Sequence, residues 1–427
     1  QLRVIVQMID SETGFHVLSR SFDRPRDDFF NVRDEITALT VANVRVALPE
    51  FKSPTSTLQS EDPELDVYLL YRRGVDASRR PASVANMTEA LDWFAAALQL
   101  DPDYAAAHAG KCITYINAYP LRDDPALIAL AEDSCGIALE LNPNLDIVHT
   151  ALGDLYRATG QYAMAEAAYR KAIEIYPSSA SALNGLGITL MRQRRPEEAE
   201  DVFELAVGLH PGDWSAYNTL GSFYYRSGLY ENAAAQYEIV VALDRSNSVG
   251  FSNLGTARML MGEFAAAADA FESSLQLESR PNTQSNLGLM HYYLGEIDAA
   301  VESHRKAVQM EPKDHLKRSN LGDALWVAGR HEEALTSYRQ ARSLALAALD
   351  VNPGDANIKM DLAWISAMLG EIDAARRLID SAREQSPDDP YLDFINALIW
   401  QSSGDSDKAL VAVRDALEDP ARLLLGI

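Results

Sequence analysis

Asparagines recur along this chain at a constant distance from a Leu-Gly dipeptide. Asn253, Asn286 and Asn320 each stand directly before Leu-Gly, and Asn184 and Asn218 stand one residue earlier in the same pattern. A carboxamide offers one acceptor and two donors, so it can bond both the C=O and the N–H of an extended peptide. The row therefore predicts a track for an unfolded segment. The alternative is that asparagine is simply common at this position and caps or solvates a helix.

The Leu-Gly dipeptide belongs to an internal repeat. It recurs from Leu152-Gly153 to Leu321-Gly322 at steps of 33 or 34 residues, together with a periodic alanine, an aromatic residue four positions later and a proline at the end of most units. Small side chains let neighbouring helices approach closely, and proline stops a helix. A glycine seven residues after the dipeptide suits a helix end, because glycine adopts the left-handed conformation at little cost. The pattern predicts helix-turn-helix units. These glycines are Gly160, Gly228, Gly262, Gly295, Gly329, Gly370 and Gly404.

Together these residues resemble the tetratricopeptide repeat, since the spacing, Leu-Gly, alanine, aromatic residue and proline all match over residues 63–420. The resemblance implies an all-α fold, a right-handed superhelical solenoid of about ten helix-turn-helix repeats. One unit, which ends at Pro353, carries about seven extra residues and is expected to have a longer second helix. The last two units match less well, as expected of terminal repeats.

Residues 1–48 have a different pattern. Residues 2–22 are rich in β-branched and apolar side chains and break at residues 11–14, which predicts a β-hairpin. Apolar residues then step by threes and fours, which predicts a helix that Pro49 ends. Residues 49–62 are rich in Pro, Ser and Thr and predict a linker. Residues 421–427 are expected to form a C-terminal tail.

The order of residues from the hairpin into the first repeat carries a second resemblance. The matching residues are Asp10, Thr13, Gly14, Ser19 and Phe22, then Tyr68, Leu70, Arg72, Arg73 and Gly74. They resemble the end of the TolB-like α/β domain of bacterial multidomain signalling proteins. Such proteins carry, upstream, a class III adenylate cyclase-type domain or the winged-helix domain of a transcriptional regulator. The chain begins at Gln1 inside a predicted strand, so we expect it to be the regulatory part of such a longer protein.

Composition restricts the partners. Lys and Arg total 38 against 62 Asp and Glu, a net charge of −24, so direct nucleic acid binding is disfavoured. No apolar run is long enough to span a bilayer and no signal peptide opens the chain. We therefore expect a soluble, cytoplasmic segment, with periplasmic exposure if a membrane segment lies upstream. Cys112 and Cys135 lack metal-ligand spacing and are expected to be two buried small side chains within one repeat.

The sequence lacks recognisable catalytic motifs. The sequence has no HExxH, no GxSxG, no phosphate-binding glycine loop and no cyclase motif. His304 and His315 are the closest histidine pair, and we expect them to be surface residues without a metal. The sequence predicts no enzyme activity, no cofactor and no metal for this segment.

The tetratricopeptide resemblance also assigns an inner face. With the Leu-Gly glycine as position eight, it places positions two, five, six, nine, twelve and thirteen of each first helix there. Position twelve carries Tyr225, Tyr292 and Trp326, a usual composition of binding hot spots, although these side chains could equally pack between helices. Arg192 and Arg226 at position thirteen could receive acidic groups. Lys at five with Asn at nine, which chaperone-tail recognition needs, is absent.

The leading hypothesis is a non-enzymatic protein–protein interaction scaffold for bacterial signal transduction. It would bind a protein or an extended peptide in the concave groove. The residues expected to bind are Asn184, Asn218, Asn253, Asn286, Asn320, Tyr225, Tyr292, Trp326, Arg192 and Arg226. The alternative is a dimerisation module, in which the hairpin and the repeat ends pair two copies and control an upstream output domain.

Overall fold

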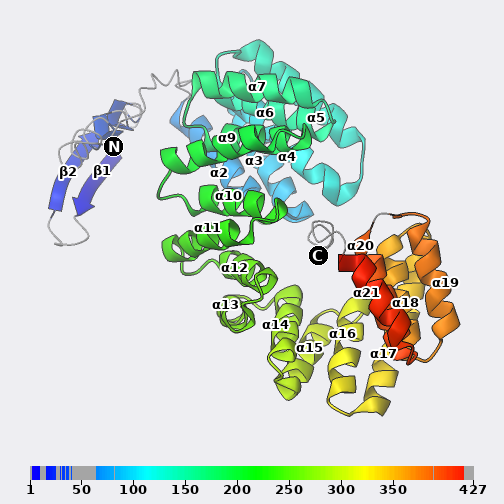
Figure 1. Ribbon diagram of the computed structural model, residues 1–427. Coiled ribbons are helices and arrows are strands. Elements are labelled where there is room, and N and C mark those ends of the chain that lie inside the picture. Colours follow the sequence, from blue (N-terminus) through cyan, green and yellow to red (C-terminus); the bar gives the residue numbers. More distant parts are fainter. Residues whose placement is uncertain are drawn as a thin grey trace. The chain divides into compact units, whose positions relative to one another are not determined.

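The computed structural model describes residues 2–9, 16–25, 29, 31–33, 35–37, 40, 64–80, 82–387 and 389–417. Within these residues the chain is almost entirely helical, with one two-stranded sheet. The helices follow one another as ten helix-turn-helix pairs (Figure 1). This confirms the predicted all-α repeat solenoid. No helix of the described part has the length and apolar character that crossing a membrane requires.

Each pair consists of a first and a second helix. The first helices are α2 (Leu65–Ser78), α4 (Ala105–Arg122), α6 (Asp146–Ala158), α8 (Ala180–Arg192), α10 (Trp214–Arg226), α12 (Ser248–Leu260), α14 (Pro281–Tyr293), α16 (His315–Val327), α18 (Ala356–Met368) and α20 (Pro390–Ser402). The second helices are α3 (Val84–Leu100), α5 (Ala126–Leu141), α7 (Tyr162–Ile175), α9 (Pro196–Leu209), α11 (Tyr230–Leu243), α13 (Phe264–Leu277), α15 (Ile297–Met310), α17 (His331–Val351), α19 (Ile372–Arg383) and α21 (Ser406–Leu417). We number the pairs as repeats 1 to 10.

The chain divides into two compact units. Unit 1 is Gln1–Pro211, with repeats 1 to 4, and unit 2 is Gly212–Ile427, with repeats 5 to 10. Within each unit the second helix of one repeat packs against the first helix of the next, as α7 does on α8 and α13 on α14. Each unit therefore has its own continuous core.

The N-terminal strands β1 (Leu2–Ile9) and β2 (His16–Arg24) pair antiparallel, with Val4 opposite Phe22. This confirms the strands of the predicted hairpin, whose turn lies outside the described residues. Of the helix predicted next, the described positions between 29 and 40 are helical. The predicted linker and the C-terminal tail also lie outside the described residues, so those boundaries stay predictions.

The turns between paired helices follow the sequence pattern. The seven glycines predicted to end first helices all have positive φ, between 73° and 82°. Repeat 4 differs, because Arg194 takes the left-handed conformation there, with φ 60°. The extra residues before Pro353 lengthen α17 to 21 residues, against 14 in α15, as predicted.

A glycine and an aromatic ring hold the two helices of most repeats together. The Tyr169 ring of α7 fills the space that a Cβ would occupy on Gly153 of α6 and on Gly185 of α8, at 2.5 and 2.3 Å. We call the position of this ring on the second helix the ring slot. A ring there binds its own first helix and the next one, which explains why the Leu-Gly glycine recurs. The same pairing joins Gly187 to Phe203, Gly221 to Tyr237, Gly255 to Phe271 and Gly322 to Tyr338.

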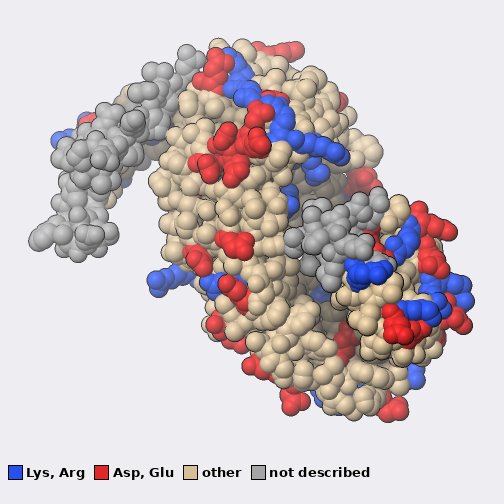
Figure 2. All heavy atoms as spheres, viewed as in Figure 1, with Lys and Arg blue, Asp and Glu red and all other residues tan. Residues whose placement is uncertain are grey.

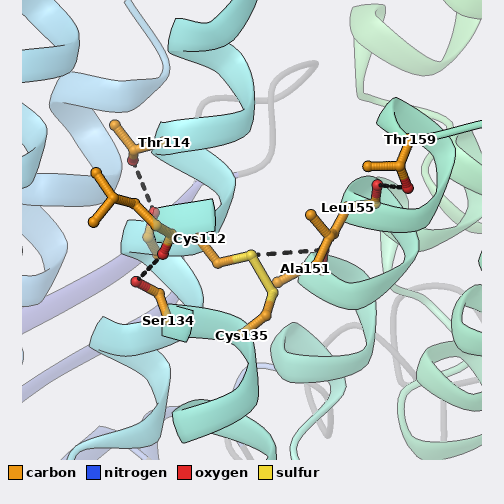
Figure 3. The surroundings of a disulfide bond; sticks show 9 residues. Cys112, Thr114, Ser134, Cys135, Ala151, Leu155 and Thr159 are labelled. Atoms are coloured by element: carbon orange, nitrogen blue, oxygen red, sulfur yellow. Dashed lines mark hydrogen bonds between the residues drawn. A yellow bond between two sulfur atoms is a disulfide. The ribbon is translucent and has the colours of Figure 1, made fainter. Parts of the chain in front are cut away.

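Four repeats fill the ring slot differently, and the two terminal ones, repeats 9 and 10, place Ile379 and Val413 there. In repeat 7 the slot holds His304, whose ring lies 2.8 Å from the Cβ position of Gly288. His304 is 2% exposed, so the expectation of a surface histidine is wrong. In repeat 2 Cys112 takes the place of the Leu-Gly glycine and Cys135 takes the ring slot. Both cysteines are buried within one repeat, as predicted, but they also form a disulfide that the sequence analysis did not foresee (Figure 3).

Candidate protein-interaction surface

The first helices form the inner layer of each unit. In unit 2, α12 contacts α14, α14 contacts α16 and α18 contacts α20, and in unit 1 α4 contacts α6 and α6 contacts α8. Because successive first helices touch directly, polar side chains of one repeat lie next to those of the following repeat. We define the inner strip as the six inner-face positions of α12, α14 and α16. It comprises Val249, Ser252, Asn253, Thr256, Met259, Leu260, Asn282, Ser285, Asn286, Leu289, Tyr292, Tyr293, Leu316, Ser319, Asn320, Asp323, Trp326 and Val327.

The structure divides the asparagine row by hydrogen bonding. Asn253 donates from Nδ2 to Asn218 Oδ1 at 3.0 Å, and Asn320 donates to Ser285 Oγ at 3.4 Å. Asn286 makes no side-chain hydrogen bond within the described part of the chain. Neighbouring polar residues also bond from helix to helix, as Ser252 does with Thr283. Three asparagines therefore help to join first helices, and Asn286 is the one of the four in unit 2 whose amide has no hydrogen bond within the described residues.

The remaining polar candidates are spread over both units. Asn184 belongs to unit 1, and its Oδ1 is buried without a hydrogen-bond partner among the described residues. Arg192 ends α8 and Arg226 ends α10, and both are exposed. Asn184 and Arg192 lie in unit 1, whereas Asn218, Asn253, Asn286 and Asn320 lie in unit 2. Their binding roles stay predictions, as does the dimerisation alternative.

Aromatic side chains of the first helices pack partly against their own repeat. The Tyr225 ring lies 5.9 Å from that of Tyr230, and the Trp326 ring lies 4.5 Å from that of His331. Trp326 nevertheless remains 38% exposed. These rings thus combine the two interpretations of the sequence, packing and binding, because each ring packs against its own repeat and leaves part of its surface exposed.

Tyr293 is a surface residue that the sequence analysis missed. Its ring stacks on Phe264 at 4.8 Å, meets the neighbouring Tyr292 edge-on at 5.9 Å and stays 55% exposed. It follows Tyr292 at inner-face position thirteen, where only arginines had been considered. The aromatic pair at positions twelve and thirteen was the signal that could have found it.

Charge is depleted along the inner strip. Asp323 is its single charged member, whereas 23% of the whole chain is charged. The contrast within the molecule is clear on unit 1, where Arg195 pairs with Glu166 at 2.8 Å and with Glu198 at 2.6 Å. Figure 2 shows charged side chains gathered over α7 and α9, the helices that carry this network. The strip therefore presents mainly amide, hydroxyl and apolar groups.

Asp323 is occupied by the fold. Its Oδ1 accepts hydrogen bonds from Tyr338 Oη at 2.6 Å and from Trp364 Nε1 at 3.0 Å. Burial raises the pKa of Asp323 to about 6, against the opposing effect of these two donors. Asp154 has the same position in repeat 3 and accepts from Tyr169 Oη at 2.6 Å. Both carboxylates anchor the ring-slot tyrosine, which explains them without a catalytic role.

Histidines and acidic residues form no metal-binding group among the described residues. His315 contacts Asp361 through Nε2 at 2.9 Å, and this hydrogen bond raises the pKa of His315. His304 lies in the core, where burial lowers its pKa to about 4. The two histidines therefore have separate structural surroundings.

Family comparisons agree with this architecture. Models of the tetratricopeptide repeat match residues 150–213, 215–247 and 336–394. These segments of the chain are tetratricopeptide repeats. A model of the bacterial transcriptional activator domain also matches residues 265–360. These matches support a protein-interaction scaffold, as predicted, and they leave the ligand open.

Individual relatives are partial. The protein named "Putative adenylate cyclase 3" of Rhizobium meliloti (strain 1021) is 34% identical over 114 residues, 26% of this chain. The chain spans only 19% of that relative's length. A crystal structure of MamA is 26% identical over 39% of the chain and 92% of its own, with a TM-score of 0.36. Pseudomonas aeruginosa PilF is 24% identical over 49% of the chain and 93% of its own, with a TM-score of 0.41.

Proposed function

We propose that the inner strip of unit 2 binds an extended, largely uncharged segment of a partner protein, and that this chain is the regulatory part of a longer bacterial signalling protein. Asn286 would bond the backbone of the bound segment. Tyr292, Tyr293 and Trp326 would contact its side chains.

The open amide of Asn286 carries this proposal. Asn253 and Asn320, one repeat before and after it, are engaged with Asn218 and Ser285. The helix packing that positions these two neighbours also fixes the position of the Asn286 amide. Its donors and its acceptor remain unused within the described residues. Such a group can form the paired hydrogen bonds that an extended backbone offers at any sequence.

The surroundings of Asn286 favour a neutral ligand. Tyr293, Leu316 and Trp326 are 55%, 48% and 38% exposed, although large apolar side chains usually lose more of their surface on folding. Aromatic residues with few charges are typical of the centre of a protein interface. A strongly charged peptide would lose hydration there without gaining a partner.

The signalling role draws on similarity. The curated relative is named as a cyclase, and the segment shared with it covers a fifth of its length. The TolB-like resemblance of the N-terminal residues agrees with a chain that reports to an output domain elsewhere in the protein. Binding in the strip would then be the input.

The test uses a displayed library of ten-residue peptides selected on the purified chain. One selected peptide is titrated by fluorescence anisotropy against the wild type, Asn286→Ala and the matched control Asn253→Ala. We expect Asn286→Ala to weaken binding about tenfold, the loss of one to two hydrogen bonds. Asn253→Ala should instead lower the melting temperature, because it removes an interhelical bond. Tyr293→Ala should also weaken binding, and the loss of its stacking on Phe264 should lower the melting temperature slightly.

Equal affinity of Asn286→Ala and of the wild type for the selected peptide would contradict the proposal. So would selected peptides that all carry several charges. A melting temperature measured for each variant separates loss of the surface from loss of the fold.

A further inference from the structure

The disulfide of repeat 2 stands where other repeats place a glycine and a ring. Cys112 lies on α4 at the Leu-Gly glycine position, and Cys135 lies on α5 in the ring slot. Their Cα atoms are 5.4 Å apart, within the range that a disulfide bridges. In this repeat the covalent bond therefore takes over the role that ring packing has elsewhere, which is to hold the first helix to the second.

The pair is enclosed in the core of unit 1. Cys112 is fully buried and Cys135 is 1% exposed. The residues packed around them are apolar, including Ile116, Val148 and Leu152. Cys112 Sγ also lies 4.0 Å from the carbonyl oxygen of Ala151 on α6, so the bond touches the next repeat (Figure 3).

These surroundings are those of a structural cross-link. A thiol that exchanges or senses oxidants is accessible and has a lowered pKa, from a cation or from a helix N-terminus. Cys112 and Cys135 both lie inside their helices and away from solvent. Exchange with a soluble thiol would require unit 1 to open, so the bond must form while repeat 2 folds and then persist.

We propose that Cys112 and Cys135 form a permanent disulfide and that this part of the protein consequently resides in an oxidising compartment outside the cytosol. Such bonds persist in oxidising surroundings and are rare where thiols are kept reduced. In the formation step the two thiols release two protons and two electrons. A thiol–disulfide oxidoreductase accepts both, and its own disulfide becomes a dithiol.

The location favoured here differs from the cytoplasmic one expected from composition. It agrees with the periplasmic exposure expected if a membrane segment lies upstream of this chain. A bound segment of the kind proposed above would then be encountered on the outer side of that membrane. The disulfide inference itself needs no ligand and stands apart from the peptide proposal.

The experiment starts with the full-length protein in the cells that make it. Cells are quenched with acid, proteins are denatured and free thiols are alkylated, and mass spectrometry reads the peptides that contain Cys112 and Cys135. We expect no alkylation before reduction and alkylation of both residues after it. Two alkylated thiols without reductant would overturn the proposal.

A second measurement tests the structural role. Reduction of the purified chain should lower the melting temperature of unit 1 by about 10 °C, from the freed loop between the two cysteines. The variant Cys112→Gly with Cys135→Phe, which recreates a glycine–ring pair, should not respond to reductant. Cys112→Ala with Cys135→Ala serves the same purpose if the larger ring does not fit. An unchanged melting temperature of wild-type protein in which alkylation shows both cysteines to be reduced would overturn the structural role.

Discussion

Repeats 2 and 7 depart at the same position from the repeats that carry tyrosine or phenylalanine there, and they do so with opposite chemistry. Repeat 2 replaces the ring of the second helix by a disulfide between Cys112 and Cys135. Repeat 7 keeps a flat ring, but it belongs to His304, a group that can take up a proton. The ring slot therefore requires a filled volume and a link between helices, whereas the occupant decides which solution condition can weaken the repeat. Breaking the buried disulfide should weaken unit 1, and acid should weaken unit 2.

The ordinary repeats add a second rule. Where the ring slot holds tyrosine, inner-face position nine supplies its hydrogen-bond partner, as Asp154 does for Tyr169, Ser222 for Tyr237 and Asp323 for Tyr338. Where it holds phenylalanine or histidine, position nine is Val75, Ile188, Thr256 or Leu289. A buried phenol needs a hydrogen-bond partner, so the two positions change together. Position nine thus reports on packing, although it belongs to the inner face.

Replacing the ring of an ordinary ring slot by alanine should have the largest effect on stability. This effect is the reference for the changes expected in repeats 2 and 7. Tyr338→Ala removes a fully buried ring and should lower the free energy of unfolding of unit 2 by about 3–5 kcal/mol. Tyr338→Phe keeps the ring and loses only the donation to Asp323, so it should cost about 1–2 kcal/mol. Urea unfolding followed by tryptophan fluorescence measures both. Equal effects would show that filling the slot is not what holds the repeat.

His304 should make unit 2 sensitive to acid. Its folded pKa of about 4 lies below the ordinary value of 6.5, because burial and the neighbouring His291 disfavour the cation. The stabilisation is complete above pH 6.5 and is lost as pH falls toward 4. Between pH 7.5 and 5 the wild type should lose about 2 kcal/mol relative to His304→Phe, which fills the slot with a ring that cannot titrate.

Asp323 changes the stability of unit 2 in the opposite direction as the pH falls. The effect of His304 must therefore be measured against a matched variant. Its folded pKa of about 6 exceeds the ordinary 3.8, so the fold gains stability as pH falls through 6. The two effects overlap in the wild type. At each pH, the free energy of unfolding of His304→Phe, measured in urea, is subtracted from that of the wild type. The difference gives the contribution of His304 alone. A difference that stays flat from pH 7.5 to 5 would contradict the assignment.

The smallest expected effect concerns the left-handed residue that ends the first helix, which differs between repeat 4 of unit 1 and the repeats of unit 2. All six repeats after repeat 4, and repeat 3 before it, end their first helix on a left-handed glycine, but repeat 4 uses Arg194. A left-handed residue with a Cβ costs roughly 1 kcal/mol, so Arg194→Gly should stabilise unit 1 by about that amount. Gly228→Arg in unit 2 is the reciprocal control and should destabilise by a similar amount. A thermal melt with no shift in either variant would show that the turns do not limit stability.

The sequence predicted the surface unevenly. The period located Asn253, Asn286 and Asn320 correctly on successive first helices, because helical repeats place equivalent residues in equivalent surroundings. It could not separate Asn286 from its neighbours, since the bonds of Asn253 and Asn320 depend on which polar residue the adjacent helix presents. Tyr293 was missed because its exposure follows from its stacking on Phe264.

The sequence by itself determined the repeat, the helix pairs, the glycine turns and the longer α17, because each depends on residues close together in the chain. Only the tertiary structure decided the fate of residues that meet across helices. It joined Cys112 to Cys135, buried His304 against Gly288 and left Asn286 open. These outcomes depend on which side chain stands opposite, and a periodic pattern fixes the position of a residue without fixing its partner.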